Sequence, residues 1–168
     1  MIKAIYKGYS QFIEKYLNAF LKWCIIVIFF ILTTIVLLQI FFRYVLSESI
    51  FWSEEAARYL LIWLVMIAAA HEMSYAEHIK VTFFREKLSL NYKIYKLINI
   101  IIYLVLLFVL LVFLKSSYEL ATRVSRQSSP ALRISMLWPY LALPIGGFFM
   151  ILQVIKLILK TIFSKNQN

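Results

Sequence analysis

The chain has 168 residues, of which 63% are hydrophobic and 17% aromatic, while only 15% carry a charge. An ordinary soluble domain is about 45–50% apolar, so this composition excludes a soluble globular protein and predicts an integral membrane protein. The net charge of +10 comes without the aromatic and basic pattern of RNA-binding modules, so it argues against a nucleic-acid partner and indicates lipid headgroups and membrane topology instead.

The apolar residues gather into four blocks, at 23–42, 56–70, 97–114 and 136–158. A helix needs about 20 residues to cross ~30 Å of hydrocarbon, and the second block reaches that length only with its polar flanks. The chain contains only three Gly and three Pro and no alternating pattern, which favours helices over a barrel. We predict a single all-α membrane domain over residues 1–168, with four transmembrane helices at about 21–43, 53–76, 90–124 and 135–162.

Residues 1–20 precede the first span and show a different pattern. Apolar and aromatic residues recur there at three- and four-residue spacing, and Lys3, Lys7 and Lys15 lie off that stripe. This pattern predicts an N-terminal amphipathic helix that lies on the inner face of the membrane. The alternative is a cytoplasmic extension of the first span along the same axis, and the pattern leaves both open.

The second span begins in FWSEEAARYLLIW, where charged residues stand directly against an apolar run. Ser53 is a good N-cap, and Glu54 and Glu55 fall in the first turn, where carboxylates meet the positive end of the helix dipole. Glu54 and Arg58 have the i, i+4 spacing at which a helix pairs opposite charges. We predict a Glu54–Arg58 ion pair, with Ser53 and Glu55 serving the helix terminus.

One face of the second span carries positions 54, 58, 62, 65, 69 and 72. Glu54, Arg58 and Glu72 lie at the ends of this face, and Ala69 belongs to a run of alanines at 68–70. Small residues let helix backbones approach closely in lipid. This face is predicted to contact another helix, in this chain or in a partner.

His71 and His78 follow, flanked by Glu72 and Glu77. Their spacing lacks the HExxH arrangement of a zinc site, and a bis-histidine haem needs histidines on different helices. We interpret the two histidines as interfacial hydrogen-bonding residues at the end of the second span, and we predict neither a metal nor another cofactor.

The third span is predicted to be long, because no Gly or Pro interrupts it before Pro130. A helix over residues 90–124 is about 50 Å long at ~1.5 Å per residue, so it must tilt or protrude from the bilayer. The fourth span contains Pro139 and Pro144, followed by Gly146 and Gly147. These residues predict a kink or local unwinding in its outer half.

The distribution of Lys and Arg predicts the orientation, since cytoplasmic segments retain these residues. Most of the 18 Lys and Arg residues lie in inner segments if the N-terminus is cytoplasmic. The outer segments then hold Arg43, Arg58, Lys115, Arg123, Arg126 and Arg133. We predict that both termini are cytoplasmic.

The middles of the four predicted spans contain no ionisable residue. An enzyme or a self-sufficient ion-coupled carrier normally keeps such residues inside the membrane, because function must retain them against their cost. The sequence therefore predicts no catalytic residue and no substrate path through this chain alone. A small stand-alone carrier of the four-helix multidrug type and a haem-binding membrane subunit are the alternatives.

Several motifs resemble those of one family. They are Arg43-Tyr44 at the end of the first span, FWSEEAARYLLIW, Glu77-His78-Ile79-Lys80-Val81, and ALRISMLWPYLALPIGG in the fourth segment. Together they resemble the DctQ-like small membrane subunit of tripartite ATP-independent periplasmic (TRAP) transporters, over essentially the whole chain. The resemblance implies a non-catalytic subunit of the bacterial inner membrane that packs against a large transmembrane subunit. That large subunit binds Na⁺ and the substrate, an organic anion such as a C4-dicarboxylate or a sialic acid, which a periplasmic binding protein delivers.

Two sets of site residues are expected on this interpretation. The expected contacts to the large subunit are Arg43, Trp52, Glu54, Arg58, Ala69, Glu72 and His78. On the predicted outer surface Lys115, Arg123, Arg126 and Arg133 outnumber Glu119, which predicts electrostatic guidance of an acidic face of the binding protein. Solvated charges without a partner explain the same residues equally well, since an exposed charge by itself contributes little.

Overall fold

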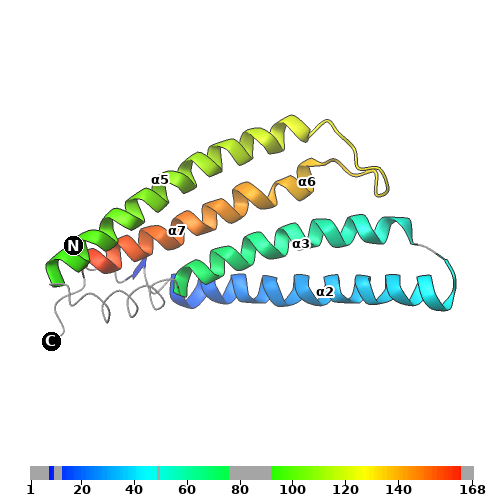
Figure 1. Cartoon of the computed structure of the whole chain (residues 1–168), viewed down its shortest axis with the longest axis horizontal. Helices are drawn as coiled ribbons and strands as arrows, with labels where there is room; N and C mark the ends of the chain where they lie inside the picture. Colours follow the sequence, from blue (N-terminus) through cyan, green and yellow to red (C-terminus); the bar gives the residue numbers. More distant parts are fainter. Residues whose placement is uncertain (1–7, 10–12, 49, 76–91, 164–168) are drawn as a thin grey trace.

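The computed structural model describes residues 8–9, 13–48, 50–75 and 92–163, and within these ranges the long elements are all helices (Figure 1). A short π-helix, η1 (Ile13–Leu17), leads into α2 (Asn18–Val45). Helix α3 (Phe51–Glu72) ends in the 3-10 turn η2 (Met73–Tyr75). The remaining helices are α5 (Tyr92–Val124), the short α6 (Leu137–Tyr140) and α7 (Ala142–Phe163).

Four helical stretches are long and apolar enough to cross a membrane, which confirms the predicted all-α fold class. They are Ile13–Val45, Phe51–Tyr75, Lys96–Val124 and Leu137–Ile162. Residues 13–20 belong to the first of these stretches, and of residues 1–12 only Gly8 and Tyr9 belong to the described part of the chain. The interfacial helix and the cytoplasmic placement of both termini stay predictions.

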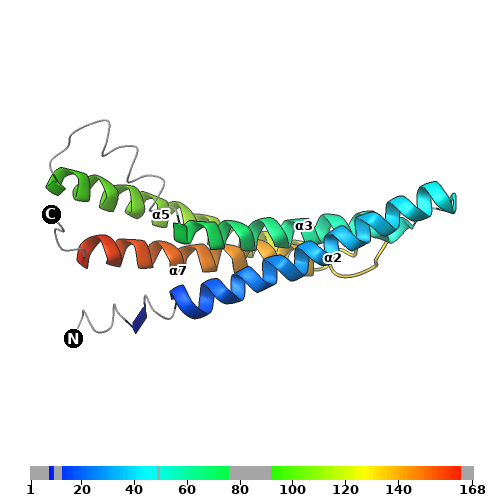
Figure 2. The same cartoon turned by 90° about the horizontal axis from the view of Figure 1, so that it is seen from below.

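The long helices lie in the order α5, α7, α3, α2 from top to bottom of Figure 1. Helix α7 packs against α5 and α3, and α3 also packs against α2, which crosses it in Figure 2. More than half of the most apolar segment of the stretch that contains α7 is buried, whereas no residue in the most apolar segment of the stretch that contains α2 is buried. Helix α7 is therefore the central helix, and α2 and α5 form the two edges.

The buried core lies mainly where η1 and the first turns of α2 meet α3 and α7. Its members are Ile13, Leu17, Leu21, Ile67, Ala70, Tyr103, Leu110, Met150, Ile151, Val154 and Leu157. We call this end of the molecule the terminal end, since the first turns of α2 and the last turns of α7 lie there in Figure 1. The opposite end, where α2 ends, α3 begins and residues 125–136 connect α5 to α6, is the hairpin end.

Two glycines allow the neighbours of α7 to approach closely. A Cβ atom on Gly146 would lie 2.8 Å from the Cβ of Met66 in α3, and one on Gly147 would lie 3.1 Å from the ring of Phe113 in α5. Such close approach of backbones is what small residues provide at helix contacts in lipid. The glycine pair thus determines how tightly α7 packs between its two neighbours.

The predicted interruption of the fourth span is present at Leu141, between α6 and α7. Pro144 has no N–H to donate to the carbonyl oxygen of Tyr140. On either side the helical hydrogen bonds persist, from the N–H of Leu141 to Leu137 O (2.9 Å) and from the N–H of Ile145 to Leu141 O (3.1 Å). The proline therefore interrupts the helix locally while the chain keeps its direction.

Candidate subunit-contact and docking sites

Helix α3 begins at the hairpin end, two residues earlier than the sequence suggested. Its N-cap is Ile50, in an extended conformation and without a capping side chain. The hydroxyl of Ser53 donates a hydrogen bond to Ile50 O at 2.7 Å, and Ser53 is only 1% exposed. The predicted N-cap role of Ser53 is therefore wrong, because α3 begins at Phe51, so Ser53 lies inside the first turn and its hydroxyl donates to the N-cap carbonyl.

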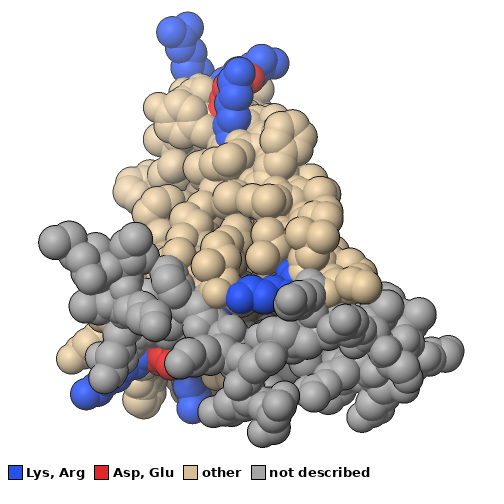
Figure 3. All heavy atoms as spheres, turned by 90° about the vertical axis from the view of Figure 1, so that its left-hand side faces the viewer, with Lys and Arg blue, Asp and Glu red and all other residues tan. Residues whose placement is uncertain are grey.

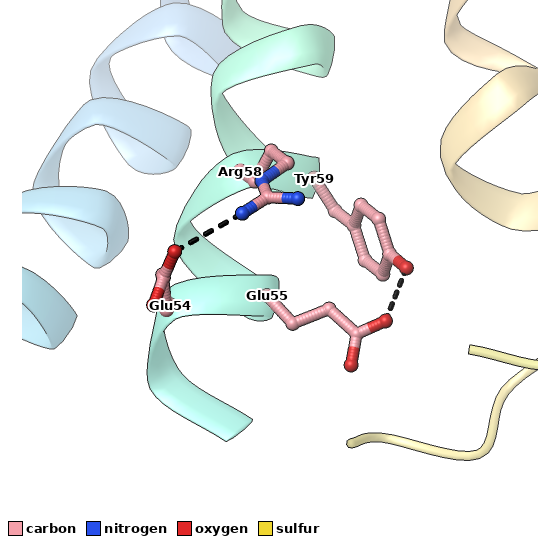
Figure 4. A network of polar contacts seen from close by, with 4 residues as sticks. All are labelled: Glu54, Glu55, Arg58 and Tyr59. Carbon is pink, nitrogen blue, oxygen red and sulfur yellow. Dashed lines mark hydrogen bonds and ion pairs between the residues drawn. The ribbon is translucent and has the colours of Figure 1, made fainter. Parts of the chain in front are cut away.

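The two adjacent carboxylates of this turn point to different partners (Figure 4). Glu54 Oε1 lies 3.1 Å from Arg58 Nη2, and both side chains are well exposed. The predicted i, i+4 ion pair is confirmed. Exposed ion pairs of this kind contribute between zero and about 1 kcal/mol to stability. Stability alone therefore does not explain why Glu54 and Arg58 stand at the start of α3.

Glu55 does not serve the helix terminus but reaches the connection between α5 and α6. Its Oε2 atom accepts hydrogen bonds from the backbone N–H groups of Ala131 (2.8 Å) and Leu132 (3.0 Å). Its Oε1 atom accepts a short hydrogen bond from the hydroxyl of Tyr59, whose oxygen also lies 3.2 Å from Met136 Sδ. Sequence spacing gave no sign of this contact, because the donors are backbone amides more than 70 positions away.

The connection is itself a compact turn, which we call the 125–136 hairpin. Ser128 and Ser135 form an antiparallel β-bridge, and the N–H of Ser129 donates to Ile134 O at 2.8 Å. The hydroxyl of Ser135 donates to Ser125 O at 2.7 Å. Arg133 has a left-handed backbone with φ 55°, which is uncommon for a residue other than glycine. Local hydrogen bonds and Glu55 together hold this conformation.

The predicted docking residues Lys115, Arg123, Arg126 and Arg133 are all exposed. Arg123 Nη2 lies 3.7 Å from Glu119 Oε2 in α5, so its charge is partly offset. Within the described ranges Arg126 and Arg133 take part in no ion pair. In Figure 3, basic side chains gather at the top of the molecule, and a broad surface of uncharged residues lies below them. The top of this view corresponds to the height of the hairpin-end part of α5 in Figure 1.

The predicted contact residues do not meet in one place. Arg43, Trp52, Glu54 and Arg58 lie at the hairpin end, whereas Ala69 and Glu72 lie near the terminal end of α3 and His78 lies outside the described residues. Positions 54, 58, 65, 69 and 72 are exposed, position 62 is half-buried, and the buried alanine of the 68–70 run is Ala70. The chain thus leaves most of the predicted contact face of α3 open.

A second polar arrangement, which sequence reasoning missed, lies at the terminal end. We call it the terminal polar cluster, formed by Glu14, Asn18, Ser74, Gln153 and Lys156. Lys156 Nζ lies 3.2 Å from Glu14 Oε1, although Lys156 is only 4% exposed. Gln153, fully buried, donates to Asn18 Oδ1 at 2.7 Å, and the Asn18 amide donates to Ser74 Oγ at 3.2 Å. The cluster joins the start of α2, η2 and α7.

The sequence does contain a signal for this cluster. Gln153 and Lys156 are three residues apart, so they share one face of a largely apolar span, and polar groups inside a membrane are costly unless they are paired. Nearby, the hydroxyl of Tyr9 donates to Leu152 O at 2.9 Å. Burial raises the pKa of the Tyr9 phenol above its ordinary value.

The described residues contain no group of three His, Cys, Asp or Glu side chains placed to hold a metal ion. His71 Nδ1 lies 3.4 Å from Glu72 Oε1, and the His71 ring lies 5.3 Å from the Tyr75 ring, centroid to centroid. His71 thus has neighbours within its own helix end, consistent with an interfacial polar residue.

Comparison with known proteins agrees with this architecture. Residues 32–163 match the family described as tripartite ATP-independent periplasmic transporters, DctQ component. The chain is also similar to the sialic acid TRAP transporter small permease protein SiaQ of Vibrio cholerae serotype O1, with 29% identity over 113 residues. That match covers 67% of this chain and 64% of the relative. The chain is a multi-pass membrane protein and belongs to the family of DctQ components of tripartite ATP-independent periplasmic transporters.

Proposed function

We propose that this chain is the small, non-catalytic permease subunit of a Na⁺-coupled TRAP transporter that takes up an organic anion. The expected substrates are carboxylates such as C4-dicarboxylates or sialic acids, and the similarity to a sialic acid TRAP small permease supports that class. The observation that carries the proposal is the open surface of the molecule: α2 and one face of α3 expose apolar and small residues that no other part of the described chain covers.

The large transmembrane subunit is the partner proposed for this surface. Without a hydrophobic driving force between helices in lipid, association depends on close packing and on polar contacts at the ends. Exposed Ala69 offers the first, and the exposed charges of Glu54, Arg58 and Glu72 offer the second. Substrate and Na⁺ sites belong to the large subunit in this proposal.

The periplasmic binding protein is the second proposed partner. The exposed basic residues of the hairpin end face the periplasm if both termini are cytoplasmic, in the bacterial inner membrane. An acidic surface of the binding protein would then be steered to this end. The described carboxylates lie near the ends of their helices or in turns, so no observation favours a stand-alone multidrug-type carrier.

Reconstitution tests the proposal directly. The chain and the large subunit are purified together in mild detergent, placed in liposomes, and supplied with binding protein and labelled sialic acid or C4-dicarboxylate. We expect a stable complex of the two membrane subunits and uptake that requires a Na⁺ gradient and the binding protein. Proton-driven uptake by this chain alone, or its purification from the native membrane without a large multi-span partner, would contradict the proposal.

A further inference from the structure

We propose that Glu55 is a positioning residue that holds the tip of the 125–136 hairpin in the conformation that presents Arg133 to an acidic surface of the binding protein. This inference rests on the proposed function. It concerns a carboxylate whose role the helix start does not explain, since Glu55 neither caps α3 nor pairs with Arg58.

The tip of the hairpin depends on Glu55 for its polar contacts. The backbone bonds of the hairpin run from Ser129 N to Ile134 O, from Arg133 N to Ser129 O and from Met136 N to Gln127 O. The N–H groups of Ala131 and Leu132 donate to the Glu55 carboxylate instead. Two adjacent amides on one carboxylate oxygen form a charge-assisted contact, which is stronger than a bond between neutral groups.

Arg133 follows these two amides directly and has the left-handed backbone noted above. Arginine has no intrinsic preference for that conformation, so the surrounding contacts must maintain it. The Arg133 N–H donates to Ser129 O at 3.1 Å, which ties it to the base of the turn, while Glu55 fixes the tip. Removal of the carboxylate should therefore loosen the backbone at Arg133, and with it the direction in which the Arg133 side chain leaves the hairpin.

The charge balance of the hairpin end indicates the kind of partner. Arg58 is paired with Glu54, and Arg123 with Glu119. The carboxylate of Glu55 accepts hydrogen bonds from backbone amides and forms no ion pair with an arginine of the described residues. Arg126 and Arg133 remain exposed and without an ion pair in the described part of the chain. The held backbone of the hairpin thus presents two exposed positive charges, which suit an acidic protein surface.

The experiment compares Glu55→Ala with Glu48→Ala in the reconstituted complex of both membrane subunits. Glu48 is an exposed acid in the turn before α3, so its removal changes net charge by the same amount without touching the hairpin. Initial uptake is measured against the concentration of binding protein. We expect Glu55→Ala to raise the half-saturating concentration by about tenfold with little change in the saturating rate, and Glu48→Ala to change neither.

Hydrogen exchange on the same complexes reports the hairpin directly. The amides of Ala131 and Leu132 should exchange at least about tenfold faster in Glu55→Ala than in the wild type. In Glu48→Ala these amides should stay protected, because Glu48 makes no contact with them. Glu55→Gln keeps one acceptor oxygen and should give an intermediate result, and it replaces Glu55→Ala if the alanine variant does not assemble.

A double variant links the hairpin to docking. Arg133→Ala alone should raise the half-saturating concentration, and Glu55→Ala with Arg133→Ala should be no worse than Arg133→Ala, because Glu55 acts through Arg133. Protected amides in Glu55→Ala, or an unchanged half-saturating concentration despite faster exchange, would overturn the role of Glu55. Wild-type uptake that needs no binding protein would instead contradict the proposed function.

Discussion

Lys156 shows how far the position of a charge in the sequence can differ from its place in the molecule. By sequence it belongs with the basic residues near the cytoplasmic end of the last span, where it would contact headgroups. In the structure it is 4% exposed and lies 3.2 Å from Glu14. Only Lys156 is buried, since the Glu14 side chain is 53% exposed, but removing Glu14 is still costly because the buried ammonium stays behind without its counter-charge. Glu14 and Lys156 should therefore be tested as a pair.

Glu14→Gln should lower the apparent Tm of the chain in detergent, with a loss of about 1–3 kcal/mol, because it leaves the Lys156 ammonium buried without its counter-charge. The combined change Glu14→Gln with Lys156→Met should restore most of the loss, since no charge is then buried. A thermal-shift assay on purified protein measures both variants. A double variant less stable than Glu14→Gln would show that the pair is not the source of the effect.

The pairing of Glu54 with Arg58 was predictable from the sequence, because i, i+4 neighbours meet within one helix. If they also contact the large subunit, Glu54→Gln or Arg58→Ala should weaken assembly by about tenfold or more, since each change leaves a charge unpaired at a helix contact. Co-purification in detergent of increasing stringency measures this. Glu48→Gln serves as the control, and complexes as stable as the wild type would refute the contact.

Helix α7 packs between α5 and α3, and Gly146 determines its approach to α3. Gly146→Ala should destabilise the chain by about 1–3 kcal/mol, because the new methyl group meets Met66 Cβ at 2.8 Å and its carbonyl oxygen at 3.1 Å. Gly8→Ala is the matched control, since nothing lies within 4 Å of a Cβ at that position. The two variants are compared by apparent Tm and by chemical denaturation. Equal stability of the two variants would contradict the role of Gly146 in the contact between α7 and α3.

The comparison of α3 with its sequence pattern shows what periodicity can and cannot predict. The predicted face through positions 54, 58, 62, 65, 69 and 72 does lie on one side of α3. Which side the chain itself covers was not predictable, because apolar residues surround α3 and lipid accepts apolar side chains as readily as another helix does. The structure buries Ser53, Ile67 and Ala70 instead, and leaves the charged face open.

The molecule as a whole is an open row of helices with α2 at one edge, and its charged residues lie largely at the two ends. Arg123→Glu with Arg126→Glu reverses charge at the hairpin end. If that end guides the binding protein, delivery should slow about tenfold or more at low ionic strength and less at high ionic strength, because salt screens exposed charges. Uptake by the reconstituted complex at several salt concentrations measures this, and an unchanged salt dependence would exclude the guidance.

The number of spans, the helical class and the family were all determined by the sequence alone. Those properties depend on hydrophobicity summed over about 20 consecutive residues and on short motifs, both of which are local. The order of the helices, the partner of Glu55 and the burial of Lys156 were decided only by the tertiary structure. In each of these cases the contact joins groups far apart in the chain, and in lipid such contacts depend on how backbones and side chains fit rather than on hydrophobicity, which is nearly the same for every neighbour.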